Sequence, residues 1–257
     1  MNMEAVELSI LLPALLAGAL VVSTHVPLGQ EVLRRGIIFI DLAIAQIAGL
    51  GVIAAYNFGW ETHGWEVQVI AVTTALAGAL FLYWCERRWP DIEEAIIGVM
   101  FILAATAGIL LLANNPHAGE QLKELLVGQI LWVTYESLIP TLVVYGLLLF
   151  AWFGFGKRFG SIGFYTIFAI TVTFSVQLVG VYLVFSTLII PALATRALQS
   201  HQRLWIGYSI GMLGYLLGLI ASALLDLPSG AVVVWSLAVI ALLGAGVTAA
   251  FNRRQIT

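Results

Sequence analysis

The chain alternates between long apolar stretches and short polar segments, a pattern that predicts membrane-spanning helices. Most apolar stretches approach the roughly 20 residues that a helix needs to cross a bilayer. They lack the apolar/polar alternation of a membrane β-barrel. We therefore predict an all-α, polytopic transmembrane helical bundle forming a single domain over residues 1–257. The predicted helices are 7–27, 36–57, 67–85, 95–113, 125–153, 164–178, 180–195, 204–225 and 231–251.

The segment 164–195 decides the number of spans. It is too long for one comfortable helix and too short for two full ones. Gln177 and Gly180 interrupt it, so we predict two short helices and about nine spans; a single helix there would give eight. With nine spans, all basic residues except Lys123 fall on one side of the membrane. By the positive-inside rule that side is cytoplasmic, which places the N-terminus outside and the C-terminus inside.

Composition supports the membrane class and excludes others. Of the 257 residues, 61% are hydrophobic and 10% charged, and the mean hydropathy is +1.01. A soluble domain usually has about 25% charged residues. No basic surface exists for nucleic acid, and the single cysteine, Cys85, excludes an intrachain disulfide. No phosphate-binding loop or hydrolase motif occurs, which leaves transport, channel or scaffold functions.

Small residues recur at helical spacing inside the predicted spans. Gly207, Gly211, Gly214 and Gly218 form a repeated small-xxx-small pattern. Such patterns allow helix backbones to approach closely in membranes. We expect this helix to pack tightly against its neighbours.

Polar residues deep in a span are functional candidates because they are costly in lipid. Asp41 and Gln46 form the one predicted midmembrane pair. The alternative for Asp41 is an ion pair with Arg34 or Arg35 at the cytoplasmic surface. The alternative for Gln46 is a hydrogen bond that joins two helices.

Other polar residues have structural interpretations. His25 comes at the end of the first predicted span, which favours an interfacial or helix-end role. Glu93 and Glu94 open a helix after Pro90, where carboxylates are favourable. Glu136 is not deep if residues 125–134 enter the membrane as an interfacial segment.

Several segments together resemble the integral-membrane permease family of bacterial ABC transporters that import zinc, manganese or iron(II). The strongest is Gln177-Leu-Val-Gly-Val-Tyr-Leu-Val-Phe-Ser-Thr-Leu-Ile-Ile-Pro-Ala-Leu-Ala-Thr-Arg196. The others are Pro27-Leu-Gly29 before Arg34-Arg35, Glu94-Ala-Ile-Ile-Gly98, Leu126-Val-Gly-Gln-Ile-Leu131 with Glu136-Ser-Leu138, and Asp226-Leu-Pro-Ser-Gly230. They occur in the family's order and cover most of the chain.

The resemblance implies a multi-pass protein of the bacterial inner membrane that works as a homodimer. It also implies two partners, a cytoplasmic ABC ATPase and an extracytoplasmic metal-binding protein. The chain itself then carries no cofactor, because the metal is cargo and ATP is hydrolysed on the partner. The segment that docks on the ATPase corresponds to the loop at 195–203, with Thr195, Arg196, Gln199, His201 and Arg203 as contact residues.

Two departures from the family pattern affect these expectations. The family usually carries Asp and His four residues apart on the second helix, whereas Leu42 and Gln46 occupy those positions here. Asp41 and Gln46 lie about 140° apart unless a π-bulge absorbs one residue, and an amide binds Zn²⁺ or Mn²⁺ more weakly than imidazole. The join at 154–163 is also shorter than in the family, which removes part of the usual ATPase-facing surface.

The leading hypothesis is a permease in which two copies form a metal path, with Asp41 meeting the ion and Gln46 assisting. The alternative is a permease-like scaffold or passive channel that has lost ATPase coupling.

Overall fold

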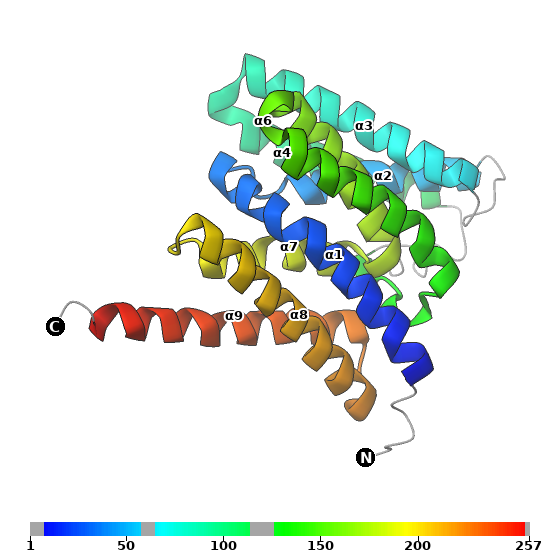
Figure 1. Cartoon of the computed structure of the whole chain (residues 1–257). Coiled ribbons are helices and arrows are strands. Elements are labelled where there is room, and N and C mark those ends of the chain that lie inside the picture. The colour runs from blue at the N-terminus through cyan, green and yellow to red at the C-terminus, as the bar shows by residue number, and fades with distance from the viewer. Residues whose placement is uncertain (1–7, 58–64, 114–125, 255–257) are drawn as a thin grey trace. The chain divides into compact units, whose positions relative to one another are not determined.

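The computed structural model describes residues 8–57, 65–113 and 126–254, and every regular element in this part of the chain is helical (Figure 1). The all-helical class predicted from the sequence is confirmed. The elements are α1 (Leu8–Arg35), α2 (Ile40–Asn57), α3 (Trp65–Arg88), η2 (Pro90–Ile92), α4 (Glu93–Leu112), η3 (Ile130–Trp132), α6 (Tyr135–Val179), α7 (Val181–Thr195), α8 (Ser200–Leu225) and α9 (Ser229–Arg254).

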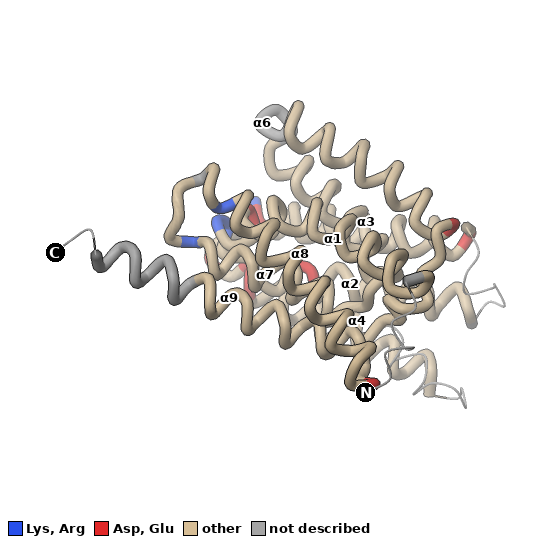
Figure 2. The backbone as a smooth tube through the Cα atoms, turned by 60° about the horizontal axis from the view of Figure 1, so that its bottom comes forward, with Lys and Arg blue, Asp and Glu red and all other residues tan. Residues whose placement is uncertain are grey.

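Hydropathy and length identify six helical segments of the described chain as candidate membrane spans. Six segments of the described chain are long and apolar enough to cross a bilayer, and three shorter apolar helices are Ile40–Tyr56, Val181–Thr195 and Ser229–Gly244. The charged residues coloured in Figure 2 lie near the ends of the helices, and long uncharged stretches separate them. The polytopic membrane bundle is therefore confirmed. Lys123, the basic residue expected on the opposite side, lies outside the described residues.

The described chain divides into two compact units. The first contains α1, η3, the start of α6, α7, α8 and α9. The second comprises Gly36–Leu126 and Val143–Gln177, with α2, α3, α4 and most of α6. Each unit is described by itself.

In the first unit, α1 is longer than predicted and continues through Pro27 to Arg35. Proline lacks an N–H, so the carbonyl of Ser23, four residues earlier, loses its helical donor. The hydroxyl of Tyr208 on α8 donates to that carbonyl at 3.1 Å. The prediction that the first helix ends at residue 27 is wrong because another helix satisfies the carbonyl that Pro27 frees.

Replacing Tyr208 with phenylalanine tests this account of α1. The variant leaves the Ser23 carbonyl without its donor, and we expect it to lower the free energy of unfolding by about 1–2 kcal/mol. Thermal unfolding of the purified protein in detergent measures the change. Tyr182→Phe is the control because Tyr182 is exposed. Equal melting temperatures for both variants would refute the role of Tyr208.

The small residues of α8 pack as the sequence predicts. A Cβ at Gly211 would lie 2.8 Å from Val22 of α1, and one at Gly207 would lie 2.8 Å from Val26. Further along α8, a Cβ at Gly218 would lie 2.6 Å from the Cα of Val233 on α9. The glycines therefore allow α8 to contact α1 with one half of its length and α9 with the other.

The segment before α6 is not helical over its whole length, which corrects the predicted helix 125–153. After the short turn η3, Val133 is extended and α6 begins at Tyr135. Glu136 consequently lies exposed in the first turn of α6. Residues 126–134 therefore do not continue α6 as one helix, and Glu136 lies at its start.

Two glycines allow residues 126–134 to pack closely against the break between α6 and α7. Gly128 has φ of 69° and Gly180 has φ of 82°. A Cβ at Gly180 would lie 2.6 Å from the carbonyl carbon of Val127 and 2.7 Å from the Cα of Gly128. The break at Gly180 confirms that residues 164–195 form two helices.

In the second unit, α2 packs on α3 and α4, and α6 folds back on itself. Ile47 and Gly51 of α2 lie against Gly78 and Thr74 of α3. The backbone of α6 turns at Gly160, where φ is 57° and ψ is −153°. Between the two arms of α6, the hydroxyl of Tyr145 donates to the carbonyl of Thr171 at 3.0 Å and also contacts Ser175. The short join between the fifth and sixth predicted spans is thus a sharp turn within one hairpin.

Candidate functional site

Asp41 lies in the first turn of α2 and is buried, with 1% of its surface exposed. Neither carboxylate oxygen has a hydrogen-bond partner among the described residues. A buried carboxylate without a partner is costly. Its position at a helix N-terminus offsets only part of that cost.

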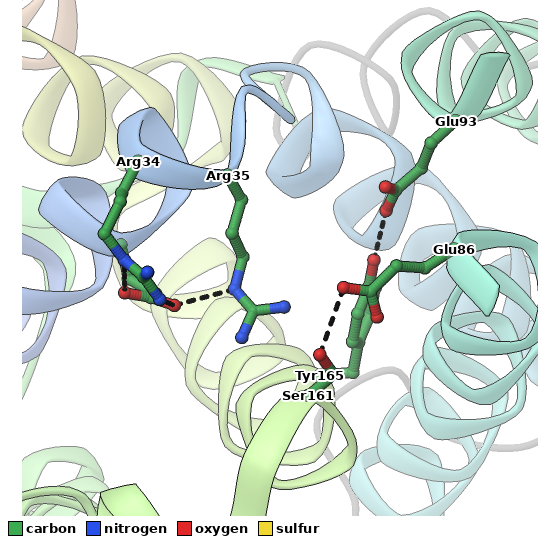
Figure 3. Close-up of polar contacts among 7 residues, drawn as sticks. Arg34, Arg35, Glu86, Glu93, Ser161 and Tyr165 are labelled. Carbon is green, nitrogen blue, oxygen red and sulfur yellow. Dashed lines mark hydrogen bonds and ion pairs between the residues drawn. The ribbon is translucent and has the colours of Figure 1, made fainter. Parts of the chain in front are cut away.

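The arginines proposed as partners for Asp41 bind elsewhere. The guanidinium Nε atoms of Arg34 and Arg35 each donate to the carboxylate of Glu31 at 2.7 Å (Figure 3). All three residues lie on the last turns of α1, three or four positions apart. Each arginine therefore has an acidic partner on α1 itself.

Glu94 reaches the same end of α2 from α4. Its Oε1 accepts a hydrogen bond at 3.2 Å from the backbone N–H of Phe39, which directly precedes α2. The amino end of α2 therefore has two acidic side chains nearby, its own Asp41 and Glu94 from α4. Sequence reasoning gave Glu94 only a role at the start of its own helix, and nothing in the local sequence signals a bond across 55 residues.

Gln46 lies on a different face of α2 from Asp41. The helix contains no π segment between them, so five residues separate the two side chains by about 140°. Gln46 shares a face with Ile53, whose Cδ1 would lie 3.2 Å from a Cβ at Gly108 of α4. Asp41 instead shares a face with the buried residues Ala45 and Ala48. The two residues of the predicted pair are therefore not brought together by α2 itself.

The loop expected to dock on the ATPase is a tight connection of four residues between α7 and α8. Its backbone is fixed by bonds from the N–H of Leu198 to the carbonyl of Thr195 and from the N–H of Arg203 to the carbonyl of Gln199, each of 2.9 Å. The Nε of Arg203 also donates to the carbonyl of Leu198 at 2.6 Å. The loop therefore has a defined shape.

The five candidate docking residues differ in accessibility. Thr195 is buried and its hydroxyl donates to the carbonyl of Pro191 at 2.8 Å, while Arg203 braces the loop. Arg196, Gln199 and His201 are exposed. Trp205, which the sequence reasoning missed, is 66% exposed on α8, and its ring lies 6.3 Å from that of His201. A tryptophan one turn after His201 on the same helix could have signalled this surface.

The turn of α6 is held to α3 and α4 by hydroxyl groups (Figure 3). The hydroxyl of Ser161 donates to Oε1 of Glu86 at 3.0 Å, and that of Tyr165 donates to Glu93. Among the described residues, no three His, Cys, Asp or Glu side chains gather closely enough to hold a metal ion. The described part of the chain therefore offers separate polar groups and no closed metal centre.

Comparison with known proteins places these features in a family context. The model of the ABC 3 transport family matches residues 7–166 and 154–248. The high-affinity zinc uptake system membrane protein ZnuB of Haemophilus influenzae is 25% identical over 246 residues, covering 88% of this chain and 92% of ZnuB. A Chlamydia trachomatis protein named "Probable metal transport system membrane protein" is 24% identical, over 87% of this chain and 84% of its own.

A solved structure shares the fold. PsaBC from Streptococcus pneumoniae in complex with Fab superposes with a TM-score of 0.74. The alignment covers 91% of this chain and 90% of the other, at 19% sequence identity. The likeness therefore extends over nearly the whole chain.

Proposed function

Because the chain belongs to the ABC 3 transport family, we propose that it forms, as a dimer, the membrane path of an ATP-driven importer of zinc, manganese or iron. It is a multi-pass membrane subunit of an ABC import system and not the ATPase. Relatives named for metal transport and zinc uptake support the choice of cargo. The partners are a cytoplasmic ABC ATPase and an extracytoplasmic metal-binding protein.

One observation carries the path assignment, the buried and unpartnered carboxylate of Asp41. A buried ionisable group without a partner in a membrane protein is a functional candidate, because burial penalises its charge. Carboxylate oxygens suit divalent cations, and a metal ion passing Asp41 supplies the missing opposite charge. We assign the principal cation contact to Asp41. The assisting role of Gln46 stays a prediction, since α2 places its amide on another face from Asp41.

Deleting the gene and restoring it tests the transport function. We expect the deletion strain to lose uptake of radioactive zinc, manganese or iron, and the restored chain to recover it. Unchanged uptake of all three metals would overturn the proposal. Uptake by the chain after deletion of the ATPase would instead support the passive channel, which needs no coupling.

The α7–α8 loop supplies the proposed ATPase contact through Arg196, Gln199 and His201. Replacing all three with alanine removes exposed polar contacts and leaves the braces at Thr195 and Arg203 in place. We expect the amount of ATPase that copurifies with the chain to fall by about 10-fold or more, since a few interface residues dominate binding. Glu136→Ala is the control, because Glu136 is also exposed but lies at the start of α6 and outside the α7–α8 loop. Normal copurification of the triple variant would remove this loop from the interface.

A further inference from the structure

His25 is an ionisable residue in the interior of the α1 span that the proposed path does not yet use. It is fully buried, and α1 continues for ten residues beyond it to Arg35. At 1.5 Å per residue it lies roughly 15 Å from that end of the helix and roughly 25 Å from the other. The expectation that His25 occupies a helix end is therefore wrong. A buried imidazole at this depth requires a specific explanation.

The hydrogen bonds of His25 determine which ring nitrogen carries the proton. Nδ1 lies 2.9 Å from the carbonyl oxygen of Val21 and 3.0 Å from the hydroxyl oxygen of Thr24. A carbonyl oxygen can only accept, so Nδ1 must donate its proton there. The Thr24 hydroxyl donates to the same carbonyl at 3.1 Å. In the neutral ring, Nε2 therefore carries the lone pair.

Nothing in the described structure uses that lone pair. Nε2 is buried and has no hydrogen-bond partner among the described residues. Protonation of Nε2 would not satisfy this nitrogen, because it would leave a buried N–H donor without an acceptor and would add a buried charge. A core histidine kept for structure would be expected to have both nitrogens bonded. The observed pattern, with Nδ1–H held by a backbone carbonyl and Nε2 bare, is the arrangement that orients metal-binding histidines.

The face of α1 that carries His25 is a packing surface with fixed geometry. Gly29, one turn further on the same face, lies directly against the backbone of Leu188 on α7, and a Cβ there would lie 3.3 Å from the Cβ of Ala192. Val21 and Val32, on the same side of the helix, are also fully buried. The Nδ1 bond to Val21 therefore orients the ring on a buried face of α1.

We propose that His25 presents Nε2 as a nitrogen ligand to the divalent metal ion that the chain transports. The assignment rests on the proposed function for its cargo. Imidazole binds Zn²⁺ and Fe²⁺ well, whereas Mg²⁺, Ca²⁺ and Mn²⁺ prefer oxygen ligands. His25 therefore favours zinc and iron over Mg²⁺ and Ca²⁺, a discrimination that a carboxylate alone provides poorly.

Two substitutions separate the ligand role from a structural one. Asparagine places an amide near the position of Nδ1 and can keep the bond to Val21 but removes Nε2, whereas glutamine places its amide near Nε2. We expect His25→Asn to lower metal uptake by about 10-fold or more and His25→Gln to retain more uptake, with both variants present at normal levels in the membrane. If His25 had only a structural role through its Nδ1 bond, His25→Asn should retain more uptake than His25→Gln. Wild-type uptake by His25→Asn would overturn the assignment.

A spectroscopic measurement tests ligation without relying on transport. The chain has four histidines, so replacing His63, His117 and His201 with glutamine leaves His25 as the only imidazole. With Cu²⁺ added as a paramagnetic probe to this full-length variant in lipid nanodiscs, pulsed electron paramagnetic resonance should show nitrogen modulation from imidazole. The modulation should disappear when His25→Asn is added. Its absence from the His25-only variant would refute the ligand assignment. Its presence there, together with no metal import by the unmodified chain, would refute only the transport function.

Discussion

Replacing Asp41 with asparagine is expected to lower the initial rate of metal uptake by about 10- to 100-fold, the loss for an interaction of about 1.5–3 kcal/mol with a charged group. Asparagine keeps the size of the side chain but removes the negative charge that meets the cation. Uptake of the radioactive metal by cells that contain the complete system measures the effect.

The same substitution should not destabilise the protein. Asp41 is buried with no hydrogen-bond partner among the described residues, so removing its charge removes a desolvation cost. We expect the melting temperature of Asp41→Asn to equal or exceed that of the unmodified chain. Loss of function with retained or increased stability is typical of a residue kept for activity. Loss of both would indicate a structural role for Asp41.

Asp226→Asn is the matched control for Asp41→Asn. Asp226 is exposed, and its left-handed backbone, with φ of 52°, suits asparagine as well as aspartate. We expect its uptake rate to equal that of the unmodified chain. Equal reductions in both variants would mean that a general loss of negative charge, and not the position of Asp41, limits uptake.

Replacing Gly180 with alanine is expected to give the largest loss of stability among the substitutions considered. Gly180 has φ of 82° and ψ of 162°, a conformation essentially restricted to glycine that costs other residues about 1–3 kcal/mol. The added Cβ would also overlap backbone atoms of Val127 and Gly128. Backbone atoms cannot move aside as the end of a flexible side chain can. We expect the free energy of unfolding to fall by about 3 kcal/mol or more.

Thermal unfolding and the yield of folded protein in detergent measure the effect of Gly180→Ala. Gly146→Ala is the control, because a Cβ at Gly146 in α6 meets no atom within 4 Å and alanine favours a helix. We expect that control to be neutral or slightly stabilising. A Gly180→Ala chain as stable as the control would show that residues 126–134 and the α6–α7 break do not pack as described.

Hydropathy predicted the class of fold and most helices because lipid requires long apolar segments with internal backbone bonding. The break at Gly180 could also be predicted, since glycine interrupts an apolar stretch of unsuitable length. The extent of α1 could not be predicted from Pro27, because the compensating donor, Tyr208, lies 185 residues away in the chain. Local rules for proline describe only the helix that contains it.

The candidate site was predicted in part. The acidic side chain in an apolar stretch identified Asp41, but its predicted midmembrane depth is wrong, because Asp41 lies in the first turn of α2. Its surroundings depend on tertiary contacts such as that between Glu94 and Phe39. His25 was misinterpreted for the same reason, because its burial follows from the unexpected length of α1. The positions of Gln46 and Asp41 on different faces follow from helical geometry alone and could be predicted.

The central claim is that this chain carries metal ions across a membrane under the control of ATP. It is tested most directly in proteoliposomes that contain the chain with its ATPase, loaded with ATP on the ATPase side and supplied with metal-loaded binding protein on the other. The account predicts accumulation of zinc, manganese or iron that stops when ATP is omitted and falls sharply in Asp41→Asn. Accumulation that proceeds equally without ATP, or that is unchanged in Asp41→Asn, would contradict it.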